Sequence, residues 1–66
     1  MKQARLTEVH DERGVLQRII ANDAETGEHV LDAVCGPYDS RTPEEREEFR
    51  KWFRDFLRRK DYEAIN

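Results

Sequence analysis

The sequence has few residues of the kinds that build covalent or metal-dependent structure. It contains one cysteine, Cys35, so no disulfide can form within the chain, and only two histidines, His10 and His29, accompany it. Their spacing matches no zinc motif, and a structural zinc site takes four nitrogen or sulfur ligands. We therefore expect no metal, no cofactor and a reducing, cytoplasmic setting.

Long apolar runs are also missing. No segment resembles a signal peptide or has the length of an apolar membrane span, so no membrane partner is expected. With 66 residues the chain is expected to form one domain, residues 1–66. A core of this size supplies only roughly 3–5 kcal/mol of net stability, and a partner that adds buried area is therefore expected.

Positive charge is scarce in the first part of the chain. The net charge is −3, and residues 1–40 hold four Lys or Arg against eight Asp or Glu, whereas residues 41–66 hold eight against seven. Nucleic-acid surfaces need clustered bases. The alternative function, a nucleic-acid-binding module of βββα type, would therefore use a basic row of the C-terminal segment, namely Arg50, Lys51, Arg54 and Arg58.

The strongest local signal predicts a helix near residues 43–60. Thr42 is a suitable N-cap residue, Pro43 fits the first helical position, and Glu45 completes a T-x-x-E capping box. We expect one apolar face of this helix to be buried, and residues 61–66 to form a frayed tail. The face consists of Phe49, Trp52, Phe53, Phe56 and Leu57.

Two turns closed by glycine precede the helix. The segments "DERG" and "NDAETG" each place glycine where hairpin loops use a left-handed residue. They predict strands near residues 4–11, 15–22 and 28–35. The fold class is then α+β, a three-stranded antiparallel sheet followed by one C-terminal amphipathic helix (βββα). The apolar spacing also fits a small all-α bundle, but the β-branched content of "VLQRII" favours strands.

Pairing at the two hairpin turns predicts the register, with Asp11 opposite Val15 and Asp23 opposite Glu28. In this register the helix covers three cross-strand rows, Leu6 with Ile20 and Leu31, Glu8 with Arg18 and Ala33, and His10 with Leu16 and Cys35. We expect Glu8 and Arg18 to form an ion pair, and Tyr38 to lie over the edge of the core.

The opposite face of the predicted sheet has apolar residues and no second helix to cover it. Large exposed apolar patches usually mark contact sites. We therefore expect a protein to bind this face, and Ile19→Asp to abolish assembly without unfolding the chain. The expected contact residues are Val9, Ile19, Val30 and Val34, with Arg5 and Asp32 at the rim.

No group of residues indicates an enzymatic reaction, and we expect no catalytic residues. A thiolate at Cys35 would need an electropositive setting, which the acidic first part of the chain does not offer. A chain this short is also expected to lack room for a substrate pocket of roughly 300 Å³. Cys35 is expected to pack as a small buried hydrophobe.

The element order, with the "DAETG" hairpin and the "GPYDS" segment before the helix, resembles a known βββα plan. It is that of the arm-type DNA-binding domains of tyrosine recombinases and of plant ethylene-response-factor domains, and the resemblance spans roughly residues 5–60. It implies that the uncovered sheet face enters the DNA major groove. Here that face would offer Arg5 as its only base, in an acidic segment, so the DNA-contacting positions do not carry over.

Together these features favour a non-enzymatic protein–protein interaction module. We expect a small cytoplasmic regulator, adaptor or inhibitor of the kind that phages and mobile elements encode. It would act as a homodimer or by docking on a larger protein.

Overall fold

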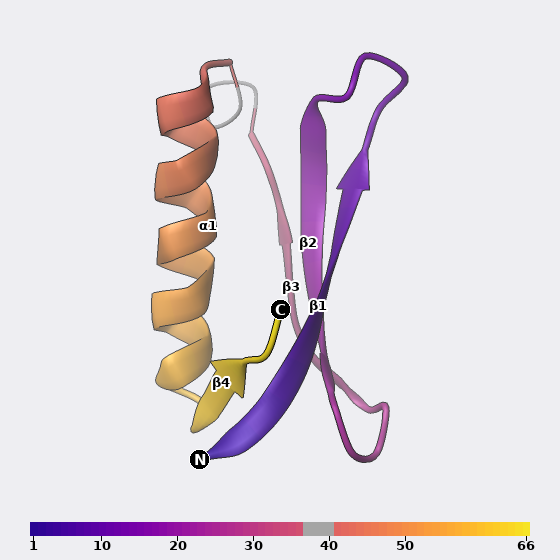
Figure 1. The fold of residues 1–66 in the computed structure, drawn as a ribbon, viewed down its shortest axis with the longest axis vertical. Helices are drawn as coiled ribbons and strands as arrows, with labels where there is room; N and C mark the ends of the chain where they lie inside the picture. The colour runs from indigo at the N-terminus through magenta and orange to yellow at the C-terminus, as the bar shows by residue number, and fades with distance from the viewer. Residues whose placement is uncertain (37–40) are drawn as a thin grey trace.

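The computed structural model describes residues 1–36 and 41–66 (Figure 1), and the expected position of Tyr38 lies outside them. The fold class is α+β, as predicted, with three strands before one helix. The all-α alternative is wrong, and a fourth strand follows the helix. In chain order the elements are β1 (Lys2–His10), β2 (Leu16–Asp23), β3 (His29–Val34), α1 (Pro43–Arg58) and β4 (Tyr62–Ala64).

The four strands form one mixed sheet in the order β3-β2-β1-β4. β2 is antiparallel to both β1 and β3, whereas β4 runs parallel to β1. Gly14 and Gly27 lie in the two hairpin turns with φ angles of 80° and 81°, a conformation that costs glycine little because it has no Cβ. α1 lies against one face of this sheet (Figure 1).

The register of the first hairpin shifts by one residue within β2. His10 pairs with Leu16, as predicted, but Val9 pairs with Arg18. Gln17 lies between the two paired residues of β2 and has no partner in β1, which is the geometry of a β-bulge. The turn signals therefore predicted the pairing correctly beside the turn but not beyond the bulge.

The bulge exchanges the sides of two neighbouring isoleucines. Ile19 faces α1 and is 1% exposed, whereas Ile20 is partly buried on the opposite face. The predicted places of both residues are wrong, because a shift of one residue moves each following side chain to the other face of a strand.

A second irregularity lies between β2 and β3. Ala21 pairs with Leu31, but the next residue, Asn22, pairs with His29, so that Val30 has no partner in β2. Val30 is partly buried and packs against the core. Its predicted place on the open face as a contact residue is therefore also wrong.

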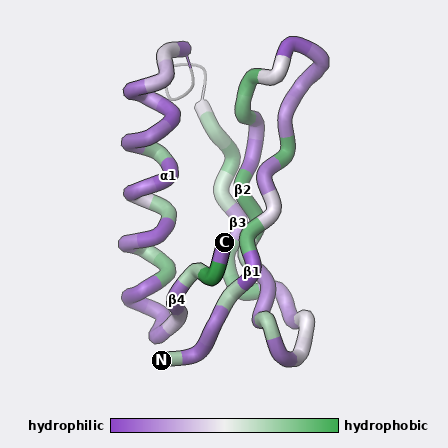
Figure 2. Tube along the Cα trace, viewed as in Figure 1, coloured by the Kyte–Doolittle hydropathy of each residue, from purple (hydrophilic) through white to green (hydrophobic). Residues whose placement is uncertain are grey.

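The core fills the space between α1 and the inner face of the sheet. Phe53 is its largest fully buried side chain. Ala4 and Ala21 belong to the two central strands, and their small side chains leave room for the aromatic rings of the helix. In Figure 2 the apolar segments gather along β2 and β3, while the turns are hydrophilic. The buried cluster contains Ala4, Leu16, Ile19, Ala21, Cys35, Phe49, Phe53 and Leu57.

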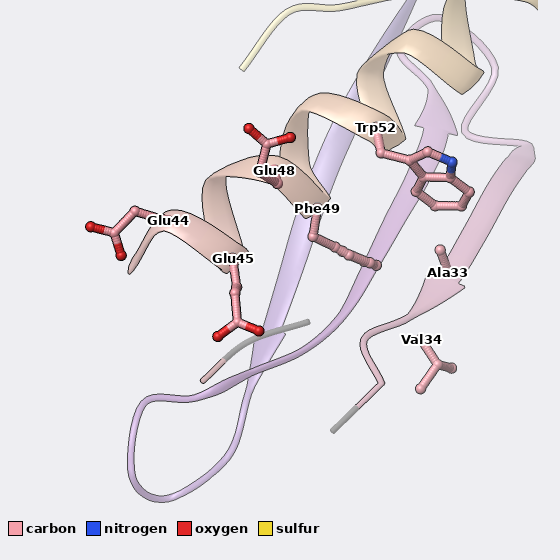
Figure 3. A pocket seen from close by; sticks show the side chains of 7 residues that line it. All are labelled: Ala33, Val34, Glu44, Glu45, Glu48, Phe49 and Trp52. Carbon is pink, nitrogen blue, oxygen red and sulfur yellow. The ribbon is translucent and has the colours of Figure 1, made fainter. Parts of the chain in front are cut away.

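The predicted start of α1 is confirmed. Thr42 is the N-cap residue, its hydroxyl accepts a hydrogen bond from the backbone N–H of Glu45 at 3.1 Å, and Pro43 opens the helix. The predicted burial of the apolar face is correct for only part of it. Trp52 is 52% exposed, because it projects from the flank of α1 toward β3, where the sheet ends (Figure 3).

The predicted frayed tail is wrong, because the chain returns to the sheet after α1. Asp61 adopts a φ of 64°, and its carbonyl accepts the N–H of Lys2 at 3.0 Å. After β4, the side chain of Asn66 accepts the backbone N–H of Leu6 at 2.7 Å and donates to the Leu6 carbonyl at 2.9 Å. The amide group thereby extends the pairing along β1.

A hydrogen bond joins β4 to the end of β2. The Tyr62 hydroxyl donates to Asp23 Oδ2 at 2.6 Å, while the N–H groups of Glu25 and Thr26 donate to Oδ1 at 2.8 and 3.0 Å. These bonds, with that from Tyr62 the strongest, lower the pKa of Asp23 from 3.8 to about 2. The same carboxylate raises the pKa of Tyr62.

Because of the bulge, the same substitution is expected to have different effects on stability at the adjacent positions 19 and 20. Ile19→Asp places a carboxylate in the core and is expected to cost more than about 4 kcal/mol, enough to unfold a domain of this size. Ile20→Asp, on the outer face, should cost about 1 kcal/mol and leave the chain folded. Circular dichroism with urea titration measures both. A folded Ile19→Asp variant would contradict the observed register.

The Asp23 carboxylate predicts a pH dependence of stability. Because its pKa is lower in the folded chain, its contribution is present above the ordinary value of 3.8 and is lost as the pH falls toward about 2. Tyr62→Phe removes the strongest of the three bonds and should move the pKa of Asp23 upward, flattening the acid-side loss of stability. An NMR titration of the carboxyl group and urea unfolding at several pH values test this. An unchanged Asp23 pKa in the variant would contradict it.

Candidate functional site

The sheet face away from α1 is mixed rather than continuously apolar. One cross-strand row on it consists of Val9, Arg18 and Val34, and the next contains Ile20 and Asp32. Arg18 Nε lies 3.2 Å from Asp32 Oδ1. This ion pair places charge between the apolar side chains. It also replaces the predicted pair of Arg18 with Glu8.

The predicted protein-contact residues do not form one surface. Ile19 and Val30 belong to the core side of the structure, as described above. Arg5 is exposed on β1, and Asp32 is engaged by Arg18 and lies 3.7 Å from His29. Val9 is 41% exposed and Val34 is 67% exposed, but they belong to different outer strands of the β1–β2–β3 unit.

The predicted basic row on α1 is partly neutralised by acids. Arg50 Nε and Nη2 donate to the two carboxylate oxygens of Glu8 at 2.7 and 3.0 Å, and Nη1 donates to Glu47 at 2.6 Å. The bond from Arg50 is the main reason that the pKa of Glu8 is lowered, and the pKa of Arg50 is raised. Arg58 contacts Asp55 at 3.4 Å. Lys51 is exposed. Arg54 is partly buried, and its charge also lowers the pKa of Glu8.

The histidines and the cysteine are separated in the structure. Cys35 is 9% exposed within the core. His10 Nε2 lies 3.3 Å from Glu8, and His29 belongs to the start of β3. Among the described residues no three His, Cys, Asp or Glu side chains are grouped closely enough to hold a metal ion.

A cleft opens between the exposed flank of α1 and β3 (Figure 3). Its volume is about 670 Å³, so the expectation that so short a chain lacks room for a pocket is wrong. Phe49 and Trp52 form its apolar wall on the helix side, and Ala33 and Val34 form the strand side. Val34 is the predicted contact residue that lines this cleft.

Neighbouring rings fix the position of Trp52. Its ring centroid lies 5.7 Å from that of Phe49 and 5.6 Å from that of Phe56, in tilted arrangements typical of aromatic pairs. Trp52 therefore stands over the cleft with one side supported by the helix and the other side open. The 3.6-residue spacing identified Trp52 as apolar helix surface, but it did not indicate that the sheet ends before reaching it.

β3 is an edge strand, since β2 is its only neighbour among the described strands. The N–H of Cys35, the residue that follows β3, donates to the carbonyl of Gln17 in β2 at 2.8 Å, so the backbone groups of Cys35 face β2. Backbone groups alternate in direction from one residue to the next along an antiparallel strand. The N–H and C=O groups of Val34 and Asp32, which are one and three residues before Cys35, therefore point away from β2, toward the open edge of β3. The cleft thus borders backbone groups that are placed to pair with another strand.

The lining of the cleft is acidic. Glu44, Glu45 and Glu48 stand along its rim at the start of α1, and no basic side chain is among the described lining residues. Glu45 contacts Arg41 at 3.6 Å. Glu44 and Glu48 form no ion pair with the described residues. The site therefore combines an apolar wall, an open strand edge and unneutralised carboxylates.

No family model, curated protein or solved structure matches the chain. Within residues 1–36 and 41–66, no helix has both the length and the apolar character needed to cross a membrane. The fourth strand further separates this fold from the βββα plan that the sequence resembles.

The two carboxylates bound by Arg50 should contribute unequally to stability. Glu8→Ala breaks a two-bond contact between β1 and α1 with both side chains under one third exposed, and should cost about 1–2 kcal/mol. Glu47→Ala removes a 70% exposed partner of the same guanidinium and should cost under about 0.5 kcal/mol. Urea unfolding of both variants measures the difference. Equal losses would contradict a role for Glu8 in joining sheet and helix.

Proposed function

We propose that this chain is a non-enzymatic protein–protein interaction module, and that a segment of a partner protein binds in the cleft between α1 and β3. The observation that carries the proposal is Trp52, which is 52% exposed between a helix and an open strand edge. Burying the exposed part of this side chain against a partner would release water from a large apolar surface.

The cleft offers two complementary sources of affinity. Tryptophan is among the residues most often found at the energetic centre of protein interfaces. An open strand edge supplies backbone hydrogen bonds to an added strand, and pockets for alternate side chains supply specificity. The aromatic supports of Trp52, Phe49 and Phe56, hold it in place before a partner arrives, which reduces the ordering cost of binding.

The other surfaces support this role less well. The outer sheet face is divided by the Arg18–Asp32 ion pair. The basic row of α1 is weakened as a phosphate-binding surface because Arg50 already binds Glu8 and Glu47. The described lining of the cleft holds carboxylates and apolar groups but no serine, cysteine or histidine nucleophile.

Two exposed valines in one cross-strand row provide a matched test. A library of random peptides would be selected for binding to the immobilised chain. Val34→Lys and Trp52→Ala alter the cleft and are expected to reduce binding of the selected peptides at least about tenfold, as loss of an interface centre does. Val9→Lys adds the same charge in the same row, outside the cleft, and is expected to leave binding within about twofold.

The opposite pattern would overturn the proposal. Selected peptides that lose affinity with Val9→Lys but not with Val34→Lys would place the contact on the outer sheet face. A library that yields no binder dependent on Trp52 would also overturn it. Sedimentation at two concentrations tests whether a second copy of the chain, rather than another protein, binds in the cleft. Self-association that is abolished by Val34→Lys would assign the cleft to a second copy of the chain.

A further inference from the structure

We infer, on the basis of the proposed function, that the segment bound in the cleft is an extended strand carrying a lysine or arginine, whose stem lies against Trp52 and whose charge lies beside Glu48. Three features of the cleft point to this ligand: the direction of the open backbone groups, the aromatic wall and the sign of the charge at the rim.

The backbone direction determines which partner side chain enters the cleft. Asp32 and Val34 direct their N–H and C=O groups outward, so an added strand pairs through them at a spacing of about 4.8 Å. The side chain of Ala33 lies between these two pairing positions and points to the α1 side of the sheet, toward Trp52 (Figure 3). The partner residue opposite Ala33 therefore points into the cleft as well.

The small size of Ala33 leaves this position open for a long partner side chain. The apolar stem of a lysine or arginine would lie along the ring of Trp52. A cation near the face of an indole ring is attracted by the ring electrons, and tryptophan is the aromatic side chain that binds cations best. Glu48 precedes Trp52 by one helical turn, which puts its carboxylate on the same flank of α1.

The negative charge of the rim favours a bound segment with positive charge. Glu44 and Glu45 lie in the first turn of α1, where acids also favour the helix dipole. Glu48 lies beyond the first turn and has no ion pair among the described residues, so its charge is available to a ligand. An acidic strand would meet the carboxylates of Glu44 and Glu48, which form no ion pair with the described residues, whereas a basic strand would pair with them.

A second copy of β3 fits this site less well. In a β3–β3 pair the side chains on the core side are Val30, Leu31 and Ala33, and none of them carries a positive charge. Such a pair would leave Glu44 and Glu48 without a cationic partner. A basic strand from another protein satisfies both the apolar wall and the rim.

The test compares the peptides that bind through Trp52 with variants of the same peptides. Selected peptides should be enriched in lysine and arginine. In the tightest of them, replacing the basic residue by glutamine should weaken binding about tenfold, and replacement by glutamate should weaken it further. Because Trp52 is the only tryptophan of the chain, a blue shift of its fluorescence on titration reports binding directly.

Salt and a matched pair of carboxylate variants complete the test. The preference for the basic peptide should shrink between about 0.05 M and about 0.5 M salt, since screening acts on the charge contact. Glu48→Gln should remove most of the preference. Glu25→Gln, which removes one charge from the β2–β3 turn at the far end of the molecule from the start of α1 (Figure 1), should keep it.

The outcomes separate this inference from the proposed function. Peptides that depend on Trp52 but bind equally with a basic residue or glutamine would overturn the inference and leave the interaction module in place. An equal effect of Glu48→Gln and Glu25→Gln would overturn the assignment of the charge to Glu48. If no selected peptide depends on Trp52, both proposals fail.

Discussion

One helix covers a sheet that is wider than the helix. Four strands spaced about 4.8 Å apart place the two outer strands roughly 14 Å from each other, whereas a helix with its side chains is about 10–12 Å across. α1 packs beside β4, so the uncovered width falls at β3. The cleft follows from this mismatch, because Trp52 on the β3 flank has no strand beyond it to complete its burial.

Local sequence signals predicted most of the elements, because local chemistry determines them. The N-cap at Thr42 and the proline at position 43 fix where α1 begins, and glycines 14 and 27 permit the left-handed turns. β4 was missed because three residues are too few to show a strand period, and its stability comes from pairing with β1. After β4, the hydrogen bonds of the Asn66 amide with Leu6 also have no local sequence signature.

The candidate site was predictable only in fragments. The prediction of Val34 as a contact residue and the apolar character of Trp52 followed from strand and helix periods. Their meeting depends on the order of the strands and on the bulge at Gln17, which sends Ile19 rather than Ile20 into the core. Both are tertiary properties, since a bulge is favoured by what the shifted side chains then bury, and a single sequence does not state this.

The two margins of the sheet differ, and the difference limits how the molecule can assemble. At the β1 margin, the short strand β4 and the amide of Asn66 occupy the backbone groups near Leu6, and the charged Glu8 follows. Short edge strands and charged residues oppose further strand addition. Among the described strands, strand addition is therefore favoured at the open edge of β3. If two copies paired through their β3 edges, each copy would use its favoured edge and the product would be a closed dimer. No favoured edge would be left for a third copy, so this architecture resists extension into a fibre.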